Sequence, residues 1–245
     1  MKTTFLATAL LAVLFTSGCF IDIDDDDISI GCLDADGDYV SLELNLPAID
    51  GLRNTTSAKV FITQGGEQEI IVEGKEDAIE ELELDVDDGV WEIEFDRCVR
   101  DLDNFTIYIT MPDIRYLRSS GSGDMIGENL FLVEDLELHI SGSGDIDIAA
   151  EADDIDAKLS GSGDLMIAGT ADECFYRISG SGDVEAFNLE ARTVDINSSG
   201  SGNADVLVTE LLKVNISGSG DVYYKGSPTT LDINISGSGE VFDAN

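Results

Sequence analysis

The amino-acid sequence predicts an all-β protein whose chain coils into a parallel β-helix, or β-solenoid, of about seven turns. The motif Ser-Gly-Ser-Gly-Asp, with Asn and Glu each replacing Asp once, occurs seven times. Successive copies begin 21, 19, 19, 20, 18 and 19 residues apart, and a near-fixed period of this length is typical of one structural unit stacked on copies of itself. The seven copies are Ser120–Asp124, Ser141–Asp145, Ser160–Asp164, Ser179–Asp183, Ser199–Asn203, Ser217–Asp221 and Ser236–Glu240.

The residues around each motif alternate between apolar and polar. In the second copy, Leu136, Leu138 and Ile140 share one parity with the glycines of the motif, and the serines take the other parity. Alternation that continues through the glycines indicates extended chain with one face buried and one face in water. It argues against the flexible linker that Gly/Ser composition alone would indicate. The glycines therefore mark inward positions where the chain has no room for a side chain.

The connections between the expected strands are too short for helices. Crossovers in a doubly wound sheet need about a dozen residues or more, and no helical segment separates the repeats. The three prolines, Pro47, Pro112 and Pro228, all lie outside the motifs. Short strands that recur in this way can coil, so that equivalent residues stack about 4.8 Å apart.

Residues 1–18 have the pattern of a bacterial lipoprotein signal peptide. An apolar run follows Lys2 and is too short to span a bilayer. The segment Thr16-Ser17-Gly18-Cys19 then resembles a lipobox, with Thr16 at the position where Leu is usual. This resemblance implies cleavage before Cys19 and attachment of a lipid that holds the protein to a membrane. An ordinary secreted protein is the alternative.

Residues 19–47 are expected to form an acidic tether. Asp24 to Asp27 form an acidic run, which is typical of a solvated linker and also resembles the export signals that send some Bacteroidetes lipoproteins to the outer surface. Farther along, Asp34, Asp36 and Asp38 resemble the first half of a calcium-binding loop. This match is weak because the twelfth position of the loop is not Glu.

Residues 48–245 are expected to form a single domain, with irregular strands at 48–118 and regular repeats at 119–245. Strand-like alternation covers residues 58–63, 69–73, 90–95 and 105–111. Turns are indicated at 64–66 and 87–89. Residues 76–83 are compatible with a short acidic helix.

This N-terminal order of segments resembles a known family. The segments VFITQG, IIVEG, VDDGVWEIEF and FTIYITMPDIRYLRSSGSGD, followed by further SGSGD motifs behind a lipoprotein signal, are similar to the family of putative auto-transporter adhesins with a head GIN domain. The resemblance covers nearly the whole chain from Ala48. It implies a right-handed β-helix located outside the cytoplasm, and it brings no catalytic residues.

The charge of the chain excludes one class of partner. Lys and Arg number 13 and Asp and Glu number 51, so the net charge is −38 at pH 7. A field of this sign repels nucleic acid and anionic membrane surfaces, and it attracts divalent cations. We therefore expect no nucleic acid partner.

Three cysteines remain besides Cys19. Cys32 and Cys98 can form a disulfide outside the cytoplasm, and the sequence leaves open whether they do. Cys174 has the inward parity of its repeat, which favours a buried free thiol that packs as a small hydrophobe.

The outward parity predicts two columns of serine and one column of acid along the stack. Acids about 4.8 Å apart repel each other by about 0.9 kcal/mol in bulk water, so the acid column needs hydrogen bonds to backbone amides or bound cations. Hydrogen-bonded aspartates that stabilise the turns are favoured over specific calcium binding, because one Asp per turn supplies few ligands. The candidate calcium ligands are Asp124, Asp145, Asp164, Asp183 and Asp221. The expected binding face consists of Ser141, Ser143, Ser160, Ser162, Ser179, Ser181, Ser217 and Ser219.

The sequence gives little support to an enzyme. His139 is the only histidine and has outward parity, and neither a Gly-x-Ser-x-Gly motif nor a zinc pattern occurs. We expect a lipid-anchored protein of the cell envelope, on the outer membrane and exposed at the surface. Its expected role is non-enzymatic adhesion or scaffolding, in which the acidic, serine-rich face binds a surface glycan or protein. The alternative is a carbohydrate-active β-helix enzyme that acts on a surface polysaccharide through two carboxylates.

Overall fold

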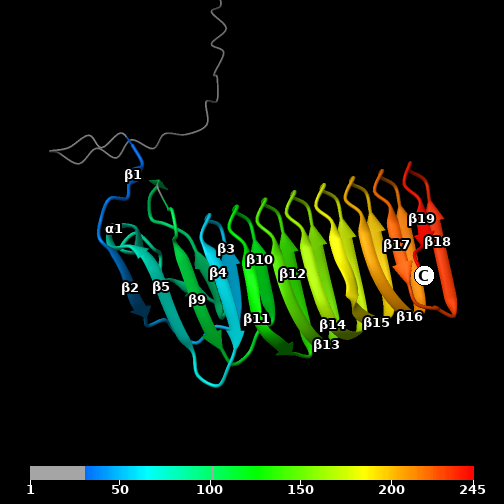
Figure 1. The fold of residues 1–245 in the computed structure, drawn as a ribbon, viewed down its shortest axis with the longest axis horizontal. Coiled ribbons are helices and arrows are strands. Elements are labelled where there is room, and N and C mark those ends of the chain that lie inside the picture. The colour runs from blue at the N-terminus through cyan, green and yellow to red at the C-terminus, as the bar shows by residue number, and fades with distance from the viewer. Residues whose placement is uncertain (1–30, 101) are drawn as a thin grey trace, which may run out of the picture. The chain divides into compact units, whose positions relative to one another are not determined.

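The computed structural model describes residues 31–100 and 102–245, so the expected signal peptide and Cys19 lie outside the described residues. The strands of the unit Leu33–Asn245 join into a 17-stranded sheet and a separate two-stranded sheet of β1 (Leu33–Asp34) and β8 (Val99–Arg100). The large sheet coils into a parallel β-solenoid of about seven turns, and its strands stack side by side from green to red in Figure 1. The predicted fold is confirmed.

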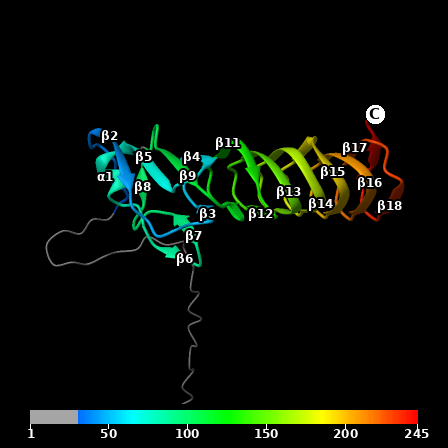
Figure 2. The ribbon, with the colours of Figure 1, turned by 90° about the horizontal axis from the view of Figure 1, so that it is seen from below.

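Each turn of the solenoid contributes one strand to each of two faces, and four long strands pass from one face to the other (Figure 2). The long strands are β13 (Ile146–Leu159), β14 (Leu165–Ile178), β15 (Val184–Ser198) and β16 (Ala204–Ile216). The first face consists of β7 (Val90–Ile93), β3 (Gly51–Asn54), β10 (Tyr116–Ser119), β12 (Asp135–Ile140), β18 (Thr230–Ile235) and the second halves of the long strands. The second face includes β9 (Thr106–Met111), β4 (Lys59–Gln64), β11 (Met125–Leu132), β17 (Val222–Lys225), β19 (Val241–Asp243) and the first halves of the long strands.

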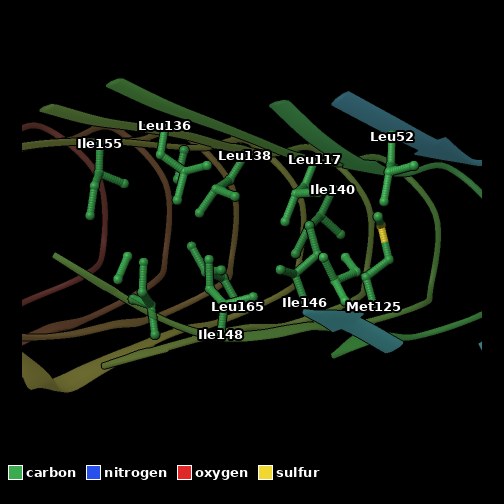
Figure 3. Packing of buried hydrophobic residues seen from close by; sticks show 14 of the residues in the cluster. Leu52, Leu117, Met125, Leu136, Leu138, Ile140, Ile146, Ile148, Ile155 and Leu165 are labelled. Carbon is green, nitrogen blue, oxygen red and sulfur yellow. The ribbon is translucent and has the colours of Figure 1, made fainter. Parts of the chain in front are cut away.

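Apolar side chains of the predicted parity fill the space between the two faces. Leu136, Leu138 and Ile140 of the first face point toward Ile146 and Ile148 of the second face, and each of the five is at most 3 % exposed (Figure 3). Burying one such side chain contributes about 1.5–3 kcal/mol relative to leaving it in water. Because each turn covers the interior of its neighbours, stacking of the turns holds the fold together.

The N-terminal strands extend the same sheet. The expected strands are present as β4, β5 (Glu69–Lys75), β7 and β9, with ends shifted by at most two residues. The expected turn joins β6 (Val86–Asp87) to β7 and places Asp88 and Gly89 at φ angles of 48° and 76°. The helix α1 (Glu76–Ile79) covers only the first half of the expected segment, because Leu82 already pairs with Phe95 in a β-bridge.

The folded unit begins earlier in the chain than the sequence predicts. The segment 19–47, expected to be a tether, contains β1 and β2 (Tyr39–Leu44), and β2 pairs antiparallel with β5. The apolar residues Val40, Leu42 and Leu44 alternate along β2 and supply the strand pattern, although acidic residues dominate the composition around them. The compact unit therefore begins at Leu33.

The two edges where the chain passes between the faces differ. We call the seven motif segments the glycine edge, and residues 150–154, 169–173, 187–193 and 207–211 the far edge. Register shifts between neighbouring turns occur at Ile126/Leu130, Met166/Ala168, Ala186/Glu190 and Ala191/Thr193, on the second face or the far edge. The variation in repeat length is thus taken up away from the glycine edge.

The last turn leaves part of the interior open. Leu231, Ile233 and Ile235 of β18 are 46, 40 and 45 % exposed, whereas the residues at the same positions of the preceding turn, Leu212, Val214 and Ile216, are at most 1 % exposed. Within the described chain, no helix has the length and apolarity needed to cross a membrane.

Candidate binding surface

The turns of the glycine edge stack through their backbones. The backbone N–H of Ser162 donates to the carbonyl oxygen of Gly142 at 2.9 Å, and that of Ser181 donates to the carbonyl oxygen of Gly161 at 3.0 Å. A Cβ atom added to Gly161 would lie closer than 3.0 Å to the carbonyl oxygen of Gly142, a separation that real Cβ atoms do not show. Both glycines of every motif meet a backbone carbonyl in this way, so the predicted close approach is confirmed.

The serines of the motifs point to solvent. All eight serines of the expected binding face are exposed. The hydroxyl of Ser141 donates to the hydroxyl of Ser120 one turn below at 3.2 Å, and the guanidinium of Arg118 donates to Ser120 at 2.9 Å. The glycine edge therefore presents two aligned columns of hydroxyl groups on stacked backbone turns.

The acid of each motif accepts a hydrogen bond from the next turn. The carboxylate of Asp145 accepts the backbone N–H of Asp164 at 2.8 Å, and the carboxylate of Asp164 accepts that of Asp183 at 2.8 Å. The same bond joins Asp124 to Asp145 (3.2 Å), Asp183 to Asn203 (2.6 Å), Asn203 to Asp221 (2.9 Å) and Asp221 to Glu240 (2.8 Å). The expected bonds to backbone amides are present, and they leave one oxygen of each carboxylate outside this ladder.

The weaker calcium candidates near the N-terminus do not converge. Asp34 lies 3.9 Å from the guanidinium of Arg100, and the backbone N–H of Asp36 donates to Asp77 at 2.9 Å. The backbone carbonyl of Asp38 accepts the N–H of Glu76, at the start of α1. Across residues 31–100 and 102–245, no three His, Cys, Asp or Glu side chains are grouped so that they can hold a metal ion.

The three cysteines that the structure describes are in states that the sequence allows. Cys32 and Cys98 are each disulfide-bonded. Cys174 is a buried free thiol, and burial raises its pKa to about 12. At neutral pH this thiol is protonated and packs as a small apolar group.

Sequence reasoning missed a column of basic side chains beside the first serine column. Two residues before the first serine, the outward residue is Arg118, His139, Lys158 and Arg177 in four successive turns. The column could have been predicted from the sequence, because residues at the same distance before each motif occupy the same position on the first face. His139 lies 2.8 Å from the carboxylate of Glu137 and packs edge-on against the ring of Tyr116.

Carboxylates dominate a groove at the far edge. The groove has a volume of about 1060 Å³, and its lining includes Glu151, Asp153, Glu190 and Glu210. Two basic residues, Arg115 and Arg192, also line it. Arg192 lies 3.3 Å from Glu210 and 3.6 Å from Asp172 and Glu173, and Arg115 lies 2.8 Å from Asp50. The far edge is therefore more acidic than the first face.

Comparison with known families agrees with this architecture. A family model described as putative auto-transporter adhesin, head GIN domain, matches residues 49–228. The chain belongs to this family. The resemblance read from the sequence is confirmed, and the GIN domain spans both the N-terminal strands and the repeats. No curated protein matches the chain.

Solved structures of similar proteins have the same fold. A putative adhesin from Bacteroides fragilis is 25% identical, with a TM-score of 0.82, and the match covers 85% of this chain and 98% of that chain. A putative lipid binding protein from Parabacteroides distasonis is 23% identical, with a TM-score of 0.67, and the match covers 87% of this chain and 100% of that one. A putative adhesin from Parabacteroides merdae is 18% identical, with a TM-score of 0.68, over 86% of this chain and 99% of that one. The last two show the fold alone.

Proposed function

We propose that this GIN-domain protein is a cell-envelope lipoprotein that binds a surface glycan or protein through the glycine edge, without catalysis. The observation that carries the proposal is the pair of exposed serine columns, held in line by a backbone that leaves no room for a Cβ atom. Rigid, repeated hydroxyl groups suit a repeating ligand, because little entropy is lost when such a surface binds. The family description as an adhesin supports a binding role.

A glycan array probed with the full chain tests this proposal. The variant Ser143→Ala/Ser162→Ala/Ser181→Ala removes three neighbouring hydroxyls of the second serine column, and we expect its array signal to fall about tenfold or more. The matched control, Ser41→Ala/Ser227→Ala, removes exposed hydroxyls outside both the glycine edge and the far-edge groove and should bind as the unaltered protein does. Equal binding by both variants, or no binding by the unaltered chain to any glycan or envelope protein, would exclude the glycine edge as the binding surface.

The lipid anchor has its own test. Cys19→Ser should abolish incorporation of labelled fatty acid and move the protein from the membrane fraction to the soluble fraction. If the variant remains in the membrane fraction, the proposed anchor is wrong. Proteolysis of intact cells then distinguishes a surface location from the inner face of the outer membrane.

Calcium remains a proposed ligand of the column Asp124, Asp145, Asp164, Asp183 and Asp221. One oxygen of each carboxylate is bonded to the next turn, so a bound ion would use the remaining oxygens. A ligand that binds only the folded state raises the unfolding midpoint. Thermal unfolding is measured once in millimolar calcium and once with a chelator. Equal unfolding midpoints under the two conditions would exclude specific calcium binding.

The second candidate function is a carbohydrate-active enzyme, which the far-edge groove favours. Glu151, Thr170 and Glu190 occupy one column there, so the two glutamates are two turns and roughly 9–10 Å apart along the stack. Inverting glycosidases hold their two carboxyl groups about 6.5–9.5 Å apart. This candidate would be supported if the full chain releases reducing sugar from a polysaccharide and the variant Glu151→Gln does not. Absence of release from acidic and neutral polysaccharides would remove it.

A further inference from the structure

The column of basic residues on the first face is unexpected in so acidic a protein. The chain has 51 acidic residues and 13 Lys and Arg residues, yet basic side chains occupy one position in five successive turns, from Arg53 to Arg177. Stacking like charges directly above one another is unfavourable, so the arrangement has a cost that scattered placement would avoid. In order along the stack, the column is Glu92, Arg53, Arg118, His139, Lys158, Arg177, Asn197, Asn215 and Asn234.

Neutralisation of neighbouring acids explains only part of this column. Arg53 forms an ion pair with Glu92 of the same column, and Arg177 forms one with Asp156 of the adjacent column. Within the part of the chain that the structure describes, Arg118 and Lys158 form no ion pair, although carboxylates are the commonest charged groups on the surface. Arg118 instead donates to the hydroxyl of Ser120 at 2.9 Å. Two cations therefore flank His139 with no carboxylate of their own.

The protonation of His139 reflects these two neighbours. Burial lowers the pKa of His139, Glu137 raises it, and Arg118 and Lys158 lower it further. The imidazole is therefore neutral at pH 7, and it can donate or accept a hydrogen bond between two fixed positive charges.

The C-terminal half of the column continues as a polar groove. The groove has a volume of about 620 Å³, and it begins at Lys158 and Arg177. Its remaining polar lining is uncharged and consists of Ser179, Asn197, Ser198, Ser199, Asn215, Ser217, Asn234 and Ser236. The side-chain amide of Asn215 donates to Asn197 at 3.2 Å, which aligns the amide column along the groove. Amide and hydroxyl groups in this number suit a ligand rich in hydroxyls.

We propose that this groove on the first face binds an anionic polysaccharide that lies along the axis of the stack. The acid groups of the ligand contact Lys158 and Arg177 in the groove and Arg118 two turns beyond Lys158 along the same column, and its hydroxyl groups contact the Asn and Ser columns. Double-stranded nucleic acid carries one charge per roughly 1.7 Å, and the net charge of −38 repels so dense an anion. A glycan with one acid group on each sugar is less dense in charge and offers hydroxyls to the rest of the groove. The inference rests on the proposed binding function and names its ligand class.

Titration calorimetry with the full chain tests the inference. The probe is hexagalacturonate, and the neutral comparison is cellohexaose. Arg118→Gln/Lys158→Gln should weaken binding of hexagalacturonate about 10- to 100-fold, as expected when two charge-assisted hydrogen bonds are lost. Affinity for the probe should also fall as salt is raised. The matched control is Arg100→Gln, which removes an exposed charge from the small two-stranded sheet and should leave binding unchanged.

Three results would overturn the inference. Equal affinity for cellohexaose would show that the groove does not select the acid group, and equal affinity for oligoglutamate would show that it does not select a sugar. Unchanged hexagalacturonate binding by the double variant would place the site elsewhere. Ser143→Ala/Ser162→Ala/Ser181→Ala could lose its glycan-array signal while Arg118→Gln/Lys158→Gln binds hexagalacturonate normally. In that case the proposed function stands and the groove inference fails.

Discussion

The glycine edge and the far edge join the same two faces, yet only the glycine edge keeps one motif in every turn. At the glycine edge the backbones of successive turns pack so closely that a Cβ atom would meet a carbonyl oxygen. At the far edge the register shifts and charged side chains line a groove, and among residues 150–154, 169–173, 187–193 and 207–211 only Gly169 makes such an approach, to the carbonyl oxygen of Ala150. Seven copies of one motif occupy the glycine edge, whereas no recurring sequence marks the far edge.

The difference shows which part of a repeat is constrained. Repeat lengths of 18 to 21 residues are accommodated because additional or missing residues fall outside the glycine edge. The glycine edge sets the alignment of the turns, and the far edge absorbs variation. Changes at the two edges should therefore have unequal effects.

A one-residue insertion should give the largest contrast. Alanine inserted between Ser162 and Gly163 inverts the parity of the chain that follows, so we expect a loss of about 5 kcal/mol or more of unfolding free energy. Alanine inserted between Asp172 and Glu173, at the far edge, should cost about 1 kcal/mol, as a bulge does. Urea unfolding followed by circular dichroism measures both. Equal losses would contradict the assignment of the edges.

Replacing a single inward glycine is the next largest change. Gly161→Ala forces a Cβ atom against the carbonyl oxygen of Gly142, and we expect a loss of about 3 kcal/mol or more. In a domain of this size that lowers the melting temperature by roughly 6–12 °C. The exposed neighbour supplies the control, because Ser162→Ala should change stability by about 0.5 kcal/mol or less. A melting temperature unchanged by Gly161→Ala would show that the turns are not in contact.

The aspartate ladder should contribute less. Asp164→Ala removes the acceptor of the Asp183 backbone N–H, and we expect a loss of about 1–2 kcal/mol. Asp164→Asn keeps an acceptor oxygen, as Asn203 does for Asp221, and should change stability by about 0.5 kcal/mol or less. Thermal unfolding of the two variants separates the hydrogen bond from the charge. Greater loss in the Asn variant than in the Ala variant would mean that the charge matters more than the bond.

The far edge offers the smallest effect. Arg192 lies near three carboxylates, but its side chain is 43% exposed, so solvent screens these ion pairs. Arg192→Gln should cost about 0.5 kcal/mol at low salt and less at high salt. A loss above about 2 kcal/mol that is independent of salt would show that Arg192 contributes more than solvent-screened ion pairs.

The repeat explains how much of the fold could be read from the sequence. A pattern that recurs seven times predicts inward and outward positions, because each copy repeats the same burial. The irregular N-terminal segments do not repeat, so no second copy supports the assignment of their inward and outward positions. The strand β2 was missed because its three apolar residues lie among acids, and the helix ended early because pairing of Leu82 with Phe95 depends on contacts distant in sequence.

The candidate surface was predictable where it depends on parity. The exposed serines and the hydrogen-bonded aspartates follow from the motif itself. The basic column was missed because three different residue types, Arg, His and Lys, occupy its position in different repeats. They form one surface only when the turns are aligned. The groove beside them depends on the shape of the first face, which no sequence pattern specifies.

Distances along one serine column test the alignment of the turns most directly. Spin labels are placed at Ser143 and, in separate samples, at Ser201, Ser219 or Ser238, which lie three, four and five turns away along the column. Cys19 is replaced by serine, and Cys174 stays unlabelled because it is buried. Double electron–electron resonance should give narrow distributions whose centres rise by about 4.8 Å with each turn, from roughly 14 to 24 Å. Broad distributions, or centres that do not rise evenly with the number of turns, would contradict the stacked array of serines.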